Sequence, residues 1–265
     1  MQQLPEEKAA GKNPVQSAQR IFGILELLAA QGKLPLHEIA QRLSLHKSTA
    51  HRLLCSLIAM GYVRKEERTG CYRLTFKLLE LSGMLLEGLD IVGLARPFLE
   101  RLGQQAHEAV HLVQRDGAEI VYIDKVEMRE GSIRMVSRIG LRRPIYCTAV
   151  GKAMLAEMPE GKVAQLWERS RIERLTERTI ISLDALFREL EEVRARGYAL
   201  DNEENEIGVR CIGACILDYQ GRANNALSVS APLSRMSDRR IQELAPFILE
   251  ARRKISRELG YQGAQ

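Results

Sequence analysis

The sequence predicts an α+β protein with a small helical part at the N-terminus and a larger part built around an antiparallel sheet. Apolar residues recur at helical spacing through the first 60 residues, whereas β-branched runs and turn residues follow residue 106. Charge divides in the same way. Residues 1–77 hold 12 Lys and Arg against 6 Asp and Glu, and residues 78–265 hold 27 against 28. A basic first part indicates contact with a polyanion.

The overall composition is that of a soluble globular protein. The chain has 265 residues, of which 45% are hydrophobic and 28% are charged. No apolar run reaches the ~18 residues that a membrane helix needs, so no membrane partner is expected. The first residues lack the apolar stretch of a signal peptide, which favours the cytoplasm. Five irregularly spaced cysteines indicate reduced thiols. Residues 1–14 are predicted to be a disordered tail.

Three helices and a hairpin are predicted within residues 15–77. The stretch "VQSAQRIFGILELLAAQG" has helical spacing and ends at Gly32, and a second helix, "LHEIAQRL", follows Pro35. After the break "SLH", a third helix, "KSTAHRLLCSLIAMG", ends at Gly61. Two alternating runs flank "ERTG" and predict a β-hairpin. Two short helices joined by a tight turn and followed by a hairpin are typical of a winged helix-turn-helix.

The polar face of the third helix carries donors that suit phosphates and base edges. A small helical bundle without a ligand and a winged-helix module that binds protein are the alternatives. The local excess of positive charge favours double-stranded DNA. The candidate DNA contacts are Lys47, Ser48, Thr49, His51 and Arg52 on the helix and Arg64, Lys65 and Arg68 on the hairpin.

The larger part alternates between helices and hairpins. Residues 78–90 are predicted to form a linker helix, followed by a helix over residues 91–106. Strands are predicted on both sides of "RDG" in "EAVHLVQRDGAEIVYIDKVE", in "SIRMVSRIG", and on both sides of the turn in "VRCIGACILDYQGRANNALSVSAP". Helices are predicted in "TAVGKAMLAEM", "KVAQLWERS", "SLDALFRELEEVRARG" and "SDRRIQELAPFILEARRKISRELG". Residues 91–260 therefore form one domain with a largely antiparallel sheet.

The motif "HEAVH", from His107 to His111, has the spacing of a zinc protease helix. It leads into the β-branched run "VHLVQRDG", which favours a strand, and a strand would place the two histidines ~13 Å apart. Cys211 and Cys215 have no second pair with zinc-like spacing. No nucleotide-binding loop is present either. No catalytic residue, metal or cofactor is therefore predicted, and a metal-dependent or cysteine hydrolase that uses His107 and His111 or Cys211 is the alternative.

Several stretches carry a family resemblance. The segment "LHEIAQRLSLHKSTAHRLLCSLIAMGYVRKEERTGCYRL" resembles the winged helix-turn-helix of the IclR family of bacterial transcription regulators. The segments "PIYCTAVGKAMLA", "TIISLDALFRELEEVRARGYALDNEENEIGVRCIGACILDYQG" and "ALSVSAPLSR" resemble the effector domain of that family. The resemblance runs from about Val15 to Gly260 in the family's order.

The resemblance implies a GAF-like effector-binding domain, a helical linker, and dimers that often pair into tetramers. It implies a cytoplasmic regulator, usually a repressor, that binds a palindromic operator and responds to a small organic acid. The stretches "SRIGLRRPIYCTAVGK" and "DNEENEIGVRCIG" resemble regulators of sugar-acid catabolism, so a keto or sugar acid is the expected effector. The implied effector site consists of Ala149, Val150, Asp201, Cys211, Ser228 and Ser230.

The chemistry of these residues suits such a ligand. Serine hydroxyls and backbone N–H groups at the start of a helix bind a carboxylate. Asp201 can accept a hydrogen bond from a sugar hydroxyl, or it can cap and order a loop. Each serine can equally be a strand residue that bonds its neighbour, so the role of each stays open at this point.

Overall fold

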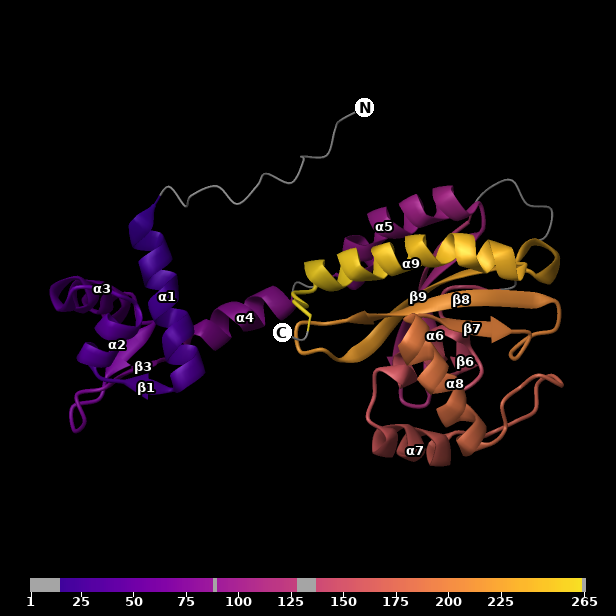
Figure 1. Ribbon diagram of the computed structural model, residues 1–265, viewed down its shortest axis with the longest axis horizontal. Helices are drawn as coiled ribbons and strands as arrows, with labels where there is room; N and C mark the ends of the chain where they lie inside the picture. Colours follow the sequence, from indigo (N-terminus) through magenta and orange to yellow (C-terminus); the bar gives the residue numbers. More distant parts are fainter. Residues whose placement is uncertain (1–14, 88–89, 128–136, 264–265) are drawn as a thin grey trace. The chain divides into compact units, whose positions relative to one another are not determined.

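The computed structural model describes residues 15–87, 90–127 and 137–263. The expected disordered tail at 1–14 and most of the strand expected within 132–140 lie outside these residues. The chain divides into two compact units, one ending at Leu89 and the other beginning at Asp90 (Figure 1). Within the described residues, no helix is both long enough and apolar enough to cross a membrane.

The N-terminal unit is a winged helix-turn-helix, as the sequence predicted. Its core holds Ile24 of the first helix, Ile39 of the second and Leu54 of the third, none of which is exposed. The wing is antiparallel, and a third short strand, not predicted from the sequence, pairs with it in the order β1-β3-β2. The elements are α1 (Gln16–Gln31), β1 (Lys33–Leu34), α2 (Leu36–Arg42), α3 (Lys47–Ala59), β2 (Val63–Lys65), β3 (Tyr72–Leu74) and α4 (Lys77–Glu87).

The C-terminal unit is a six-stranded antiparallel sheet with helices on both faces (Figure 1). The strands are β4 (Ala109–Asp116), β5 (Glu119–Val126), β6 (Arg142–Pro144), β7 (Ala199–Asn202), β8 (Val209–Leu217) and β9 (Ala223–Pro232), in the order β6-β5-β4-β9-β8-β7. The helices are α5 (Ile91–Ala106), α6 (Ala149–Ala156), α7 (Glu160–Arg169), α8 (Leu183–Arg196) and α9 (Asp238–Glu258), with a 3-10 turn η1 (Leu233–Arg235). The short strands β6 and β7 were not predicted.

Alternation along the strands separates two cores. On β8, Ile212 and Ala214 pack in the core that α5 and α9 share with the sheet. Cys215 and Leu217 pack in the other core, which α6, α7 and α8 cover. Because side chains alternate between the faces of a sheet, Cys211 and Gly213 lie on the α6 face as well.

The "HEAVH" stretch spans a helix end and a strand start. Helix α5 stops at Ala106, and His107 adopts the left-handed conformation while its N–H donates to the carbonyl of Gly103 at 2.8 Å. The prediction that the strand includes His107 is therefore wrong, because β4 begins at Ala109. Glu108 is held by Arg235 through two hydrogen bonds of 2.6 and 2.8 Å. In the part of the chain that the structure describes, no three acidic, His or Cys side chains are grouped to hold a metal.

Candidate functional sites

Helix α3 presents a polar face whose residues were predicted as DNA contacts. Its apolar side chains Ala50, Leu53 and Leu54 are buried against the helical core, so the opposite face is exposed. The turn from α2 into α3 is tight: Ser44 adopts a φ of 52°, and the N–H of Leu45 donates to Ala40 at 2.8 Å. Of the five predicted contacts on this helix, Lys47, Ser48, His51 and Arg52 are exposed and Thr49 is half-buried.

The wing adds three exposed cations. Arg64 and Lys65 lie on β2, and Arg68 lies in the turn before β3. Glu66 of the same hairpin is paired with Lys33 and Arg73, at 3.4 and 3.3 Å. Among the described residues, none of the five basic residues predicted to contact DNA has an acidic partner within 4.0 Å. The positive face of α3 and the wing is therefore free to pair with phosphates.

All six residues predicted to bind an effector line one pocket in the C-terminal unit. The pocket lies on the α6 face of the sheet, with a cavity volume of about 40 Å³ and an opening to solvent. The lining includes Ala149, Val150, Asp201, Cys211, Ser228 and Ser230. These residues come from four segments that are far apart in sequence, so the fold brings together what the sequence separated.

Strand register produces this convergence. One row across the sheet consists of Asp201, Cys211 and Ser230, and the next consists of Gly213, Ser228 and His111. Residues two apart on one strand face the same side, so both rows face the pocket layer. His111, which the sequence suggested only as a plain histidine, is thereby placed in the pocket wall.

Two glycines allow helix α6 to pack closely, Gly213 against the sheet and Gly151 against the segment that follows β6. A Cβ atom at Gly213 would lie 2.9 Å from backbone atoms of both Ala149 and Val150. A Cβ atom at Gly151 would lie 2.0 Å from the carbonyl oxygen of Ile145. The Thr148 hydroxyl caps the helix by accepting from the N–H of Gly151 at 3.1 Å. The first turn of α6 consequently presents its positive end to the pocket.

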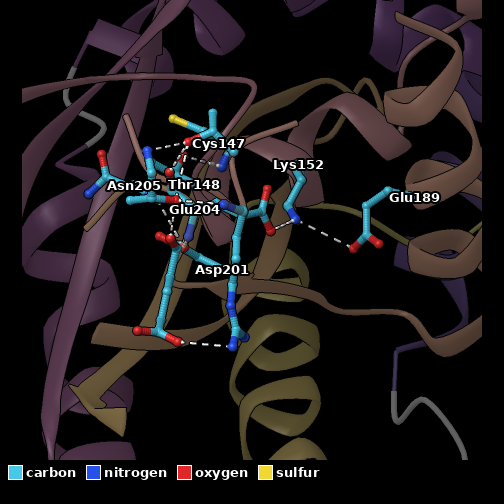
Figure 2. A network of polar contacts seen from close by, with 12 residues as sticks. Cys147, Thr148, Lys152, Glu189, Asp201, Glu204 and Asn205 are labelled. Atoms are coloured by element: carbon cyan, nitrogen blue, oxygen red, sulfur yellow. Dashed lines mark hydrogen bonds and ion pairs between the residues drawn. The ribbon is translucent and has the colours of Figure 1, made fainter. Parts of the chain in front are cut away.

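Asp201 of β7 is a buried carboxyl group in the lining of the pocket. Its Oδ1 accepts from the N–H groups of Glu204 at 2.8 Å and Asn205 at 3.3 Å (Figure 2). Burial, and secondly the negative charge of Glu204, raise the pKa of Asp201 to about 7. Near neutral pH this group can therefore either accept a hydrogen bond or, when protonated, donate one.

A buried ion pair, not predicted from the sequence, anchors the loop that follows Asp201. Lys152 of α6 is 1% exposed and pairs with Glu204, and it lies 3.5 Å from Glu189 of α8 (Figure 2). Burial raises the pKa of Glu204, while attraction to Lys152 opposes that rise. The hydroxyl of Thr179 also donates to the Glu204 carbonyl at 2.7 Å. The acidic loop is thus fixed to both helices behind the pocket.

His111 of β4 adds a buried polar side chain to the pocket lining. His111 Nε2 lies 2.7 Å from the Ser137 hydroxyl, and its Nδ1 lies 3.3 Å from the Ser230 hydroxyl. Burial, and secondly the charge of Lys125, lower the pKa of His111 to about 3, so the imidazole is neutral at physiological pH. Tyr122 and Arg143 also line the pocket, and no sequence pattern indicated either residue.

A winged helix-turn-helix joined to a sheet domain with a polar ligand pocket is the construction of a ligand-responsive transcription regulator. Residues 17–67 match the IclR helix-turn-helix domain, and residues 83–257 match the Bacterial transcriptional regulator IclR C-terminal domain. The chain therefore belongs to the IclR family of bacterial transcription regulators, which bind DNA and an effector ligand. The alternative that it is a hydrolase is not supported.

Three similar proteins are transcription regulators, and each matches this chain over most of its own length. The HTH-type transcriptional regulator KdgR of Escherichia coli (strain K12) is 40% identical over 93% of this chain and 94% of its own. The DNA-binding transcriptional repressor YiaJ of the same organism is 36% identical over 96% of this chain and 90% of its own. The crystal structure of the Agrobacterium tumefaciens repressor BlcR has a TM-score of 0.74 and 31% identity, and covers 95% of this chain and all of that one.

Proposed function

We propose that this chain is a repressor of an operon for the breakdown of a sugar acid or a related small carboxylate. It acts in the bacterial cytoplasm as a homodimer or a pair of dimers on a palindromic operator. A keto or sugar acid binds in the C-terminal pocket and changes operator affinity. The observation that carries this proposal is the single pocket lined by six residues that the family resemblance had picked out from four separate segments.

The operator contacts are assigned to the exposed faces of α3 and the wing. Bases in the major groove are read by the first turns of α3, and the wing cations hold the phosphate backbone. The assigned residues are Lys47, Ser48, Thr49, His51, Arg52, Arg64, Lys65 and Arg68. Apolar residues on and next to α4 support self-association, because Phe76, Leu79 and Met84 are 81, 64 and 69% exposed.

The effector contacts are assigned to the α6 end of the pocket. The start of α6, at Ala149 and Val150, and the hydroxyls of Ser228 and Ser230 are suited to a carboxylate. Asp201 and the Cys211 thiol complete this end. Burial keeps the pKa of Cys211 above its usual range, so the thiol is neutral and does not repel an acid.

A ligand screen followed by two variants tests the assignment. A keto or sugar acid that binds only the folded protein will raise its melting temperature, which identifies a probe ligand. The variants Asp201→Ala and Ser228→Ala are then expected to lose roughly 1–3 kcal/mol of affinity for that acid, measured by calorimetry. Their affinity for the operator without the acid stays at the parent value, because neither residue belongs to the winged helix.

Ser234→Ala, on the exposed η1 turn, is the matched control and binds the acid as the parent does. Parent-like acid binding in both pocket variants would place the effector site elsewhere. Loss of operator binding without the acid would show that the two residues support folding or assembly instead.

A further inference from the structure

Two neighbouring arginines on β6 have different environments. Arg143 lies opposite Ile120 of β5, and Ile120 packs in the core that α6 covers. Because residues directly opposite each other in a ladder face the same side of the sheet, Arg143 faces the pocket, which it lines. Arg142 faces the other way and is paired with Asp116 at 2.5 Å and Glu119 at 3.0 Å. The sheet therefore delivers one of the two cations to the pocket.

The protein itself uses little of the Arg143 guanidinium. Its Nη1 donates to the carbonyl of Arg142 at 3.1 Å, which is its one hydrogen bond to the described residues. Within the same residues, no carboxylate oxygen lies within 4.0 Å of it. A guanidinium has five N–H donors, and two of them can bind both oxygens of one carboxylate in parallel. Arg143 therefore has donors left for an acid in the pocket.

An acid in this pocket needs a cation. Two carboxyl groups, Asp201 and Glu206, line the pocket and oppose the entry of an anion. His111 does not offset them, because burial lowers its pKa to about 3 and leaves the imidazole neutral. Among the lining residues that the structure describes, Arg143 is the one side chain with a permanent positive charge. A carboxylate that loses its water here is stabilised best beside this guanidinium.

Arg143 and the start of α6 border the same space. Arg143 directly precedes Pro144, whose carbonyl accepts from the hydroxyl of Thr148, the cap of α6, at 3.3 Å. Burial, and secondly Cys211, raise the pKa of Tyr122, and the charge of Arg143 opposes that rise, so the guanidinium acts on the middle of the pocket as well. The guanidinium and the positive end of α6 thus converge on one cavity of about 40 Å³.

We propose that Arg143 is a specificity-determining residue that holds the carboxylate of the effector together with the start of α6, so that the pocket selects an acid over its uncharged amide. The guanidinium donates to the carboxylate oxygens from the β6 side, and the backbone N–H groups at the start of α6 complete the site. The six positions that the family resemblance implied contain no cation, and Arg143 is not among them. This inference rests on the proposed effector function.

The test compares an acid with its own primary amide, which has nearly the same shape and no charge. The probe is the tightest binder among gluconate, galactonate, glycerate and pyruvate, measured by calorimetry on the full chain at pH 7.5. The parent is expected to favour the acid over the amide by at least about tenfold, the effect of one hydrogen bond to a charged group. In Arg143→Gln the acid loses about this factor while the amide binds as in the parent. Arg143→Lys keeps the charge without the paired donors, and its ratio is intermediate.

Arg142→Gln is the matched control, because it removes the same charge one residue away and outside the pocket, and it keeps the parent ratio. An unchanged ratio in Arg143→Gln would overturn the proposal, since the carboxylate would then be held without the guanidinium. A parent ratio near one, or an equal loss for acid and amide in Arg143→Gln, overturns it as well. Failure of every acid to bind the parent would remove the proposed effector function and this inference with it.

Discussion

Replacing Asp201 with Asn is expected to stabilise the C-terminal unit at alkaline pH and to have little effect at acidic pH. Asn keeps the carbonyl oxygen that accepts from the N–H groups of Glu204 and Asn205, so the loop retains both hydrogen bonds. It removes only the charge. The variant therefore measures how much the ionisation of a buried carboxyl group beside Glu204 destabilises the folded chain.

Stability is lost as pH rises because the pKa of Asp201 is higher in the folded chain than in the unfolded chain. The pKa of Asp201 is about 7 in the folded chain, against about 3.9 in an unfolded chain. Between these values the folded state holds a proton that the unfolded state has released, so stability falls as pH rises through this window. Above about pH 7 both states are ionised and the loss is complete. At ~1.4 kcal/mol per pH unit, the loss between pH 5 and pH 7 is roughly 3 kcal/mol.

Urea unfolding at pH 5 and pH 8 measures this loss. Trp167, the single tryptophan, lies on α7 with its ring 5.7 Å from that of Tyr146, so its fluorescence reports on the C-terminal unit. The stability of Asp201→Asn relative to the parent should increase by roughly 3 kcal/mol from pH 5 to pH 8. Glu191→Gln, an exposed change on α8, should show no such increase. If the free energies of unfolding of Asp201→Asn and the parent differ by the same amount at both pH values, the reasoning is refuted.

Three further changes test separate parts of the structure. Gly213→Ala forces a Cβ atom against backbone atoms of α6 and should cost about 1–3 kcal/mol in urea unfolding, with weaker acid binding; parent-like values of both would contradict the close approach. Lys152→Met leaves Glu204 buried without its cation and should cost about 3–5 kcal/mol, partly restored by adding Glu204→Gln, and no restoration would disprove the pairing. Arg52→Ala should weaken operator binding in a gel-shift titration by about 1–3 kcal/mol with an unchanged melting curve, and unchanged affinity would mean that the recognition face is misplaced.

The sequence predicted the winged helix well because its signals are local. Helical spacing, the break at "SLH" and the hairpin around "ERTG" each depend on residues within a few positions of one another. The error at His107 is also local, because its left-handed helix cap has no clear sequence signature when the residue is not Gly or Asn.

Local sequence patterns could not predict the candidate effector site, because its residues are far apart in the sequence. The six effector positions came from resemblance, and strand register aligns the four that lie on strands, such as Cys211 opposite Ser230. The buried pair of Lys152 and Glu204 joins residues 52 positions apart, so spacing could not reveal it. Arg143 and its neighbour Arg142 are the same residue type in sequence, and only the alternation of β6 sends one to the pocket and the other to solvent.

The most direct test of the account measures DNA affinity with and without the acid. A palindromic fragment enriched by this protein from random DNA would be titrated by fluorescence anisotropy, in the presence and absence of the tightest-binding sugar acid. The account predicts binding that weakens steeply between about 50 and 200 mM salt and that the acid weakens further by at least about fivefold. An acid that raises the melting temperature but leaves DNA affinity unchanged, or a protein that enriches no DNA sequence, would contradict it.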